Sequence, residues 1–430
     1  MKPSGTKLQK SITWLEGSAM TVAAVVGTGV LILPGLAAQL AGPASLLAWL
    51  AMGILIIPMA VTLGMLAARM PDAGGIAAYA RRAFGRRAGA VTGWLYLGTV
   101  PIGAPIAALI GVSYIGTVID LSPLAGCMIA ALMIAASALL NMRGIQLAGW
   151  VQTGIVAAIL LILVSAIAAA FPHVSGEAFR PFAPNGYLPA GSALTVLFWA
   201  FVGWEMMSHL TEEFHNPRHV MTSVWVTIVL VNVIYFGVAF VTVGTGVYRG
   251  DNPASLAGLI GYGWGKQAGA IVGVLGFLLS FGSIHTYFAG FSRLIYAQAL
   301  NGDFPRYFGT LHARFATPHR ALAAVGGAGI AVLLAAYALH IDLVPLMQLP
   351  SSVFICLYVV AMAAGVKLAR GLLSPKLKRL SFFGLILCLA IVPFAGWVIL
   401  YPAAIAGIGY WYSRKQAAKI AVRESMERLQ

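Results

Sequence analysis

The sequence predicts an all-α integral membrane protein with twelve transmembrane helices, of which helices one and six are broken near their middle. Hydrophobic residues make up 60% of the 430 residues, charged residues only 9%, and the mean hydropathy is +0.89. No water-soluble domain could bury that much apolar surface. A one-sided distribution of basic residues and two glycine-containing interruptions are the other observations behind this prediction.

Twelve apolar segments are long enough to cross a bilayer, which takes about 20 residues of helix. The first segment has no small-residue cleavage site and continues into a full span, so we expect no cleavable signal peptide. The predicted spans are 12–40, 43–69, 88–119, 123–140, 147–170, 191–211, 221–247, 267–299, 320–339, 343–366, 379–396 and 398–413.

The basic residues lie almost entirely on one side of these spans. With the N-terminus inside, all but three of the 27 lysines and arginines fall in cytoplasmic segments, and the exceptions are Arg180, Arg249 and Lys266. This split follows the positive-inside rule. The net charge of +15 therefore reports topology and not a nucleic-acid partner, and both termini are expected in the cytoplasm.

The sequence gives no indication of a metal or a cofactor. Cys127, Cys356 and Cys388 lie inside apolar segments and show no metal-ligand spacing. Buried cysteines commonly behave as small apolar residues. We therefore expect packing roles for them, with neither a metal nor a cofactor.

The first span is interrupted by Gly27-Thr28-Gly29 and then by Pro34. Gly and Pro weaken a helix, and inside a bilayer the freed backbone groups need partners. The break would leave amide N–H groups at the positive end of the outer half-helix, where they suit a carboxylate. Val25 would border the same site. The alternative is close helix packing through small residues.

The sixth span is interrupted at Ala200-Phe201-Val202-Gly203. Carbonyl groups freed at the C-terminal end of the outer half-helix suit an ammonium group. Amide donors at one break and carbonyl acceptors at the other would together bind the zwitterion of a free α-amino acid. Because Val25, Ala200 and Val202 are small and apolar, we expect a neutral, aliphatic or thioether side chain on the substrate.

The two breaks occupy corresponding places in two halves of opposite orientation. The first span runs outward and the sixth runs inward, and each opens its half, which is typical of an inverted repeat of five plus five helices. A transport core at 12–366 would then comprise two repeats, followed by two extra helices. The predicted divisions are tails at 1–11 and 414–430, repeats at 12–170 and 191–366, and accessory helices at 367–413.

Four further side chains are candidates for coupling and gating. Glu205 lies deep in the sixth span, where it would either carry a proton or hold the unwound backbone. His285, in the eighth span, is a candidate proton relay, with a satisfied packing role as the alternative. Trp199 and Trp204 flank the second break and would either swing over a ligand as gates or pack, and packing is favoured for Trp204.

Four passages resemble the amino acid–polyamine–organocation superfamily of transporters, over about the first 340 residues. The resemblance implies a LeuT-like fold of twelve helices that works by alternating access. The passages are VVGTGVLILPG (25–35), MPDAGGIAAYARRAFGRRAGAVTGW (70–94), FWAFVGWE (198–205) and SRLIYAQALNGDFPRYFGTLHARFATPHRAL (292–322).

By motif position, the resemblance implies that residues 27–29 bind the substrate carboxylate and that the carbonyls of 200–202 bind the amine. Trp199 matches a gating aromatic, and Glu205 matches a glutamate linked to transport. Within the superfamily the chain looks most similar to bacterial exporters of methionine and branched-chain amino acids, which implies the bacterial inner membrane.

One departure from the sodium-coupled relatives of this fold weakens the case for a sodium site. Those relatives place two adjacent hydroxyl residues on the eighth span, whereas Ser280, Ser283 and Thr286 are each separated by two residues. The fifth span also lacks the lysine that replaces the ion in some proton-coupled importers. Proton antiport and uncoupled exchange therefore remain as the expected modes of transport.

We therefore expect a secondary transporter of neutral amino acids, an exporter or exchanger, linked to protons and embedded in membrane lipid. One alternative is an importer of the same fold. Another is a polytopic membrane enzyme using surface residues such as His215 and His219. A third is an amino-acid sensor on a transporter fold.

Overall fold

The regular elements in the described part of the chain are helices. The structure, a computed structural model, describes residues 13–70, 75–144, 149–204, 214, 216–249, 255–300, 302–372 and 374–427. In the first half, up to the connection before α8, the elements are α1 (Trp14–Val25), η1 (Thr28–Leu31), α2 (Leu33–Ala41), η2 (Gly42–Ala44), α3 (Ser45–Arg69), α4 (Gly75–Phe84), α5 (Arg86–Ile115), α6 (Pro123–Met142), α7 (Gly149–Ala170), η3 (Phe171–His173) and η4 (Gly176–Phe179).

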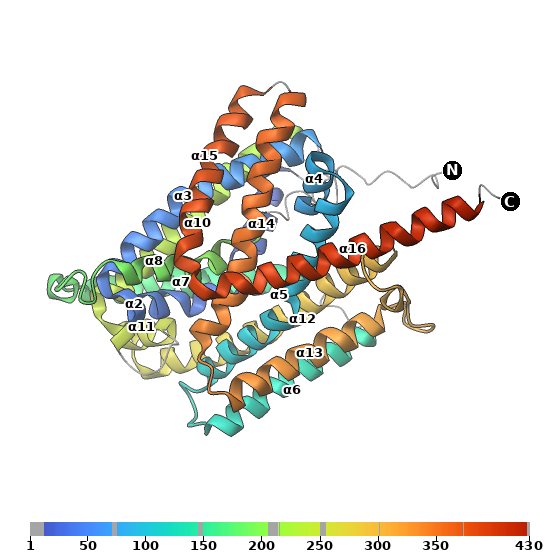
Figure 1. The fold of residues 1–430 in the computed structure, drawn as a ribbon. Coiled ribbons are helices and arrows are strands. Elements are labelled where there is room, and N and C mark those ends of the chain that lie inside the picture. Colours follow the sequence, from blue (N-terminus) through green and yellow to red (C-terminus); the bar gives the residue numbers. More distant parts are fainter. Residues whose placement is uncertain are drawn as a thin grey trace.

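The second half begins with another short helix that runs into a 3₁₀ turn (Figure 1). Its elements are α8 (Leu188–Leu197), η5 (Phe198–Phe201), α10 (Pro217–Thr245), η7 (Val247–Arg249), α11 (Ser255–Trp264), α12 (Lys266–Leu300), η8 (Arg306–Phe308), α13 (His319–Ala338) and α14 (Leu343–Gly371). The chain ends with α15 (Pro375–Ile391), η9 (Val392–Ile399) and α16 (Leu400–Glu427).

Nine helical stretches within the described ranges are long and apolar enough to cross a membrane. Two of them run through more than one predicted span. Leu33–Arg69 joins the second part of predicted span one to span two, and Pro375–Gln416 joins the last two predicted spans through a kink at Gly396 (φ +55°). The nine stretches are Leu33–Arg69, Arg86–Ile115, Pro123–Met142, Gly154–His173, Arg218–Thr245, Lys266–Leu300, His319–Ala338, Leu343–Gly371 and Pro375–Gln416.

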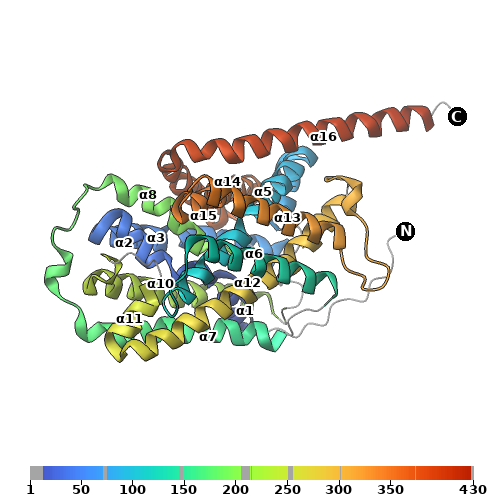
Figure 2. The same ribbon diagram turned by 90° about the horizontal axis from the view of Figure 1, so that it is seen from below.

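Helices of the first half pack against helices of the second half. The contacting pairs are α2 with α8, α3 with α10, α5 with α12, and α6 with α13. Figures 1 and 2 show α6 beside α13 at one flank, with α5 and α12 further in. The apolar surfaces of the halves are thus buried against one another.

Helix α5 separates two hydrophobic cores. Leu95, Ile102 and Ile106 belong to a large core with α2, α3, α8, α10 and α14. Val100 and Ala104 belong to a second core with α6, α12 and α13. A helix that is apolar all round is a buried helix, and α5 accordingly forms the wall between the two helix groups.

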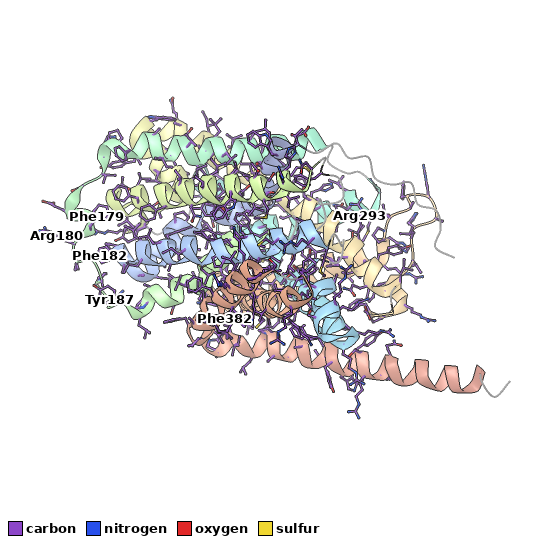
Figure 3. The ribbon with its side chains drawn as sticks, turned by 90° about the horizontal axis from the view of Figure 1, so that it is seen from above. Phe179, Arg180, Phe182, Tyr187, Arg293 and Phe382 are labelled. Atoms are coloured by element: carbon purple, nitrogen blue, oxygen red, sulfur yellow. The ribbon has the colours of Figure 1, made fainter. Side chains whose placement is uncertain are left out.

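The two ends of the molecule differ in what they carry. Phe179, Arg180, Phe182 and Tyr187 lie in the connection before α8, at one end, while Arg293 of α12 lies near the other (Figure 3). Helix α16 extends beyond the remaining helices at the end that also holds the α12–α13 connection (Figure 2). It is helical from Leu400 to Glu427, so the described part of the predicted tail, 414–427, continues the last helix.

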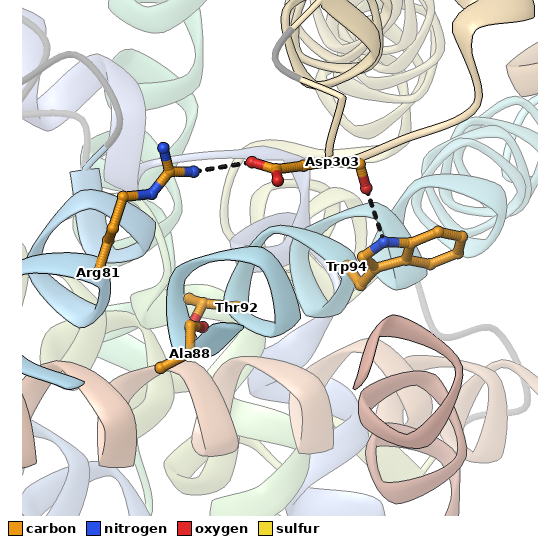
Figure 4. A network of polar contacts seen from close by, with 5 residues as sticks. All are labelled: Arg81, Ala88, Thr92, Trp94 and Asp303. Atoms are coloured by element: carbon orange, nitrogen blue, oxygen red, sulfur yellow. Dashed lines mark hydrogen bonds and ion pairs between the residues drawn. The ribbon is translucent and has the colours of Figure 1, made fainter. Parts of the chain in front are cut away.

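A polar network ties helix α4 to the α12–α13 connection (Figure 4). A guanidinium nitrogen of Arg81 lies 2.8 Å from the carboxylate of Asp303, which is 6% exposed. The indole N–H of Trp94 donates to the backbone carbonyl of Asp303 at 2.9 Å. These contacts join the consecutive helices α4 and α5 to a connection more than 200 positions later in the sequence, at one end of the helix bundle.

Candidate functional site: two facing helix breaks

The first break lies between α1 and α2. Helix α1 ends at Val25, Gly27 is extended (φ −93°, ψ −176°), and the turn η1 begins at Thr28. Pro34 is the second residue of α2 and has no N–H to donate to the carbonyl of Val30. The helix is interrupted at this point, as the glycines and the proline predict.

Two amide groups at the start of η1 are left as donors. The amide of Val30 bonds to the carbonyl of Gly27 at 3.4 Å, and that of Ile32 bonds to Gly29 at 3.2 Å. The amides of Thr28 and Gly29 have no acceptor among the described residues. Donors of this kind are what a helix start offers to an anion.

Open space adjoins these donors. Gly27 is exposed although its neighbours Val26 and Thr28 are buried, and a Cβ placed on it would meet no other atom of the described chain within 4 Å. Thr28 is 7% exposed, and its hydroxyl makes no hydrogen bond with a described residue. The backbone and one hydroxyl at the first break can therefore be reached by a small ligand.

The second break lies after α8. The turn η5 ends at Phe201, Val202 is extended (φ −82°, ψ 151°), and Gly203 has φ +122°. Residues with a Cβ rarely adopt this φ, so the chain leaves its helical path at a point that requires glycine. Val202 is partly exposed, whereas Ala200 and Phe201 are buried. The last carbonyls of η5 lack the helical donors that would follow.

A tyrosine of α10 joins the two breaks. The hydroxyl of Tyr235 lies 3.3 Å from the carbonyl of Val25 and 3.2 Å from the carbonyl of Ala200. Its ring packs against Phe201 (5.2 Å between centroids) and Trp49 (5.7 Å). Tyr235 is 1% exposed, so its O–H must find a protein acceptor. It holds the end of α1 and the end of η5 in a fixed relation.

A second tyrosine also fixes the first break. The hydroxyl of Tyr114, in α5, donates to the carbonyl of Leu31 at 2.6 Å. Leu31 closes η1, so this bond satisfies a carbonyl that the broken helix leaves open. The break is thus held by two tyrosines, one from α10 and one from α5.

Trp199 covers the first break. A Cβ on Gly29 would lie 2.7 Å from Cδ1 of Trp199 and 3.0 Å from its Nε1, so the indole rests directly on the Gly29 backbone. The ring is partly exposed and meets Phe354 of α14 edge-on, with centroids 6.0 Å apart. This position suits an aromatic lid over the amides of η1.

Trp204 is placed differently. It is 1% exposed, and its indole nitrogen has no hydrogen-bond partner among the described residues. Such burial favours the packing role over a moving gate. Glu205 lies outside the described residues, as does His215 of the enzyme alternative, so the structure says nothing of their surroundings.

His285 is hydrogen-bonded to a helix that contains neither break. Its Nδ1 lies 3.0 Å from the side-chain amide nitrogen of Asn141 in α6, and the same nitrogen donates to the His285 carbonyl at 3.1 Å. The ring is 3% exposed, between α6 and α12. This geometry favours the hydrogen-bonded packing role.

Tyr235, Tyr114 and Phe354 are missing from the residues that the sequence singles out. Each is an aromatic residue in an apolar helix, which by itself indicates only packing. A membrane-embedded tyrosine hydroxyl needs an acceptor, and this was the one available signal. The sequence could not say which carbonyl it would reach.

Comparison with known proteins places these features in context. Residues 12–414 match the profile of a family described as amino acid permease. An uncharacterized amino acid permease of Bacillus subtilis, YecA, is 43% identical over 412 residues, covering 95% of this chain and 96% of its own. The L-methionine/branched-chain amino acid exporter YjeH of Escherichia coli is 32% identical over 413 residues, covering 94% and 96%. The gamma-aminobutyric acid permease of Escherichia coli is 28% identical over 345 residues, covering 74% and 72%.

Proposed function

Because the chain belongs to the amino acid permease family of the amino acid–polyamine–organocation superfamily, we propose that it exports or exchanges neutral amino acids, such as methionine and the branched-chain residues. It is a transporter of a permease family and not an enzyme, as its relatives indicate. The proposal extends to a multi-pass protein of the bacterial inner membrane with both termini in the cytoplasm, as the charge distribution favours.

The proposal rests on one observation: the hydroxyl of Tyr235 contacts a backbone carbonyl at each of the two helix breaks, which belong to different halves of the chain. The first break offers the free amides of Thr28 and Gly29 beside the open space at Gly27. The second offers backbone carbonyls near Val202, and Ala200 keeps a second lone pair on the oxygen that Tyr235 already approaches. We assign the substrate carboxylate to residues 27–29 and its ammonium to the carbonyls of 200–203.

The residues around the breaks favour a neutral substrate side chain. Val25, Ala200 and Phe201 are buried and apolar, and Val202 is partly exposed next to them. A cationic or acidic substrate would need an opposite charge to offset its desolvation. The similarity to an exporter of methionine and branched-chain amino acids supports the same substrate class.

The arrangement of helices supports alternating access through an inverted repeat. In the proposed scheme of twelve spans, α3, α5 and α6 correspond to α10, α12 and α13, and each pair is in contact. Such pairing is what a pseudo-twofold axis in the membrane plane would produce. Rocking of one helix group against the other, across α5, would then expose the breaks to each side in turn.

We propose that Glu205 links transport to protons and that Trp199 is the gate. His285 is the second candidate for the proton, although its contact with Asn141 favours packing. Trp204 supports the second break from within the core. The direction of net transport follows the gradients, because alternating access is reversible, and import by the same route is the alternative.

Gly27→Val tests the site directly. Gly27 has an extended backbone with open space around it, so valine fits without disturbing the described chain, yet its side chain fills the space assigned to the substrate. We expect at least a tenfold loss of methionine and leucine affinity by calorimetry, with an unchanged melting temperature. Gly327→Val is the matched control, since Gly327 is also exposed and free of neighbours. Undiminished binding in a folded Gly27→Val protein would refute the proposed site.

A further inference from the structure

A cavity of about 450 Å³ lies away from the two breaks, between the end of α6 and the start of α13. Arg143, Arg320, His312 and His319 line it, and no Asp or Glu is among its described lining residues. A cluster of basic side chains without acidic partners favours an anion. The transport site does not use this cavity.

The two arginines have donors to spare. The guanidinium of Arg320 lies 4.5 Å from the centre of the Tyr307 ring and donates once, to the Tyr307 carbonyl at 3.2 Å. The side chain of Arg143, at the end of α6, makes no hydrogen bond or ion pair with a described residue. Since each guanidinium carries five N–H groups, most of their donors remain for a ligand.

His312 adds a hydrogen-bond donor to the cavity, from a loop that is held in place by hydrogen bonds. Nδ1 of His312 accepts the amides of Arg314 and Phe315 at 3.2 and 3.3 Å, so a neutral ring carries its proton on Nε2. Nδ1 of His319 is buried without a partner among the described residues. Thr317 ties this loop to α6 by donating to the carbonyl of Met142 at 2.8 Å. These hydrogen bonds fix the position of the cavity wall without a ligand.

The remaining wall is apolar and faces outward. Leu139 of α6 is 59% exposed, and Ala323 of α13 is exposed beside the same cavity. In a membrane protein such surfaces are covered by acyl chains. A free phosphate ion would use only the basic wall, whereas a phospholipid would use both.

We propose that this cavity binds an anionic phospholipid, with its phosphate among Arg143, Arg320 and His312 and an acyl chain along Leu139 and Ala323. Basic pockets between membrane helices on the cytoplasmic side suit such headgroups. The positive-inside distribution of the chain places the cavity on that side. The site is separate from the amino-acid site and does not depend on the transport proposal.

Native mass spectrometry of the delipidated full-length protein tests this inference. Phosphatidylglycerol, phosphatidylcholine and inorganic phosphate would be titrated separately into wild-type protein and into R143Q/R320Q. We expect one phosphatidylglycerol bound in preference to phosphatidylcholine, and roughly thirtyfold weaker binding in the double variant, from the loss of two basic contacts near a lipid surface. R370Q/R379Q removes the same charge from two exposed arginines elsewhere and should bind as the wild type does.

A second variant keeps the inference testable if the double variant does not fold. Ala323→Phe retains every charge and fills the cavity from an exposed position, and it should lose the bound lipid. Equal weakening in R143Q/R320Q and R370Q/R379Q would overturn the proposal, since it would show general charge attraction. Saturation by inorganic phosphate that displaces the lipid would also overturn it, in favour of a free-anion site.

Discussion

Replacing Tyr235 by phenylalanine removes the hydroxyl that joins the two helix breaks and leaves the ring in place. The contacts of that ring with Phe201 and Trp49 are expected to remain. The hydroxyl has one proton for two carbonyls, at 3.3 and 3.2 Å. The variant therefore loses about one hydrogen bond and leaves buried carbonyls less well satisfied.

The expected magnitude follows from that loss. A neutral hydrogen bond contributes about 1 kcal/mol, and a buried group without a partner costs about 1–3 kcal/mol. We expect roughly 1–2 kcal/mol less stabilisation of the joined breaks. Because 1.4 kcal/mol corresponds to tenfold in affinity, methionine and leucine should bind about 5- to 30-fold more weakly.

Tyr287→Phe supplies the matched control. The hydroxyl of Tyr287 donates to the carbonyl of Thr99 at 2.9 Å, between α12 and α5, so its removal also breaks one tyrosine–carbonyl bond. Calorimetric titration in detergent or nanodiscs, together with thermal unfolding, measures both effects. The reasoning would be supported if both variants lost similar thermal stability and only Tyr235→Phe lost affinity for methionine and leucine. Unchanged affinity in Tyr235→Phe, or equal losses in both variants, would refute it.

Two further predictions concern the second break and the proton. Gly203→Ala places a Cβ on a residue with φ +122° and should lower the free energy of unfolding by about 1–3 kcal/mol. Gly327→Ala, in α13 with no neighbour near it, should not lower thermal stability. Equal melting temperatures of the two variants would contradict this prediction. Glu205→Gln, which cannot titrate, should flatten the pH dependence of transport, while His285→Gln should retain it because His285 is seated against Asn141; the opposite pattern in proteoliposome flux would make His285 the proton carrier.

The sequence alone located the parts of this protein that depend on local chemistry. Glycine and proline at 27–35 weaken a helix wherever they stand, and the structure breaks α1 from α2 there. Apolar segment lengths gave the helix ranges closely; for example, the predicted span at 88–119 falls on α5. These features need no knowledge of which helix neighbours which.

Other features depend on tertiary contacts and were not predicted. Tyr235 follows Val25 by 210 positions, and no local pattern pairs its hydroxyl with that carbonyl. The same holds for Arg81 and Asp303, which are 222 positions apart. Helix α4 could have been predicted from the sequence, because Ile76, Tyr79 and Ala83 follow helical spacing and are buried. The segment was treated only as a connection.

Counterflow in proteoliposomes tests the central claim most directly. Vesicles containing the purified protein would be loaded with unlabelled methionine, leucine, arginine, glutamate or putrescine, and labelled methionine would be added outside, at two pH values and with or without sodium. The account predicts accumulation driven by internal methionine and leucine, a dependence on pH, and no effect of sodium. Equal accumulation with arginine or glutamate, or no counterflow by a folded protein with any of these compounds, would contradict a site built for a neutral zwitterion.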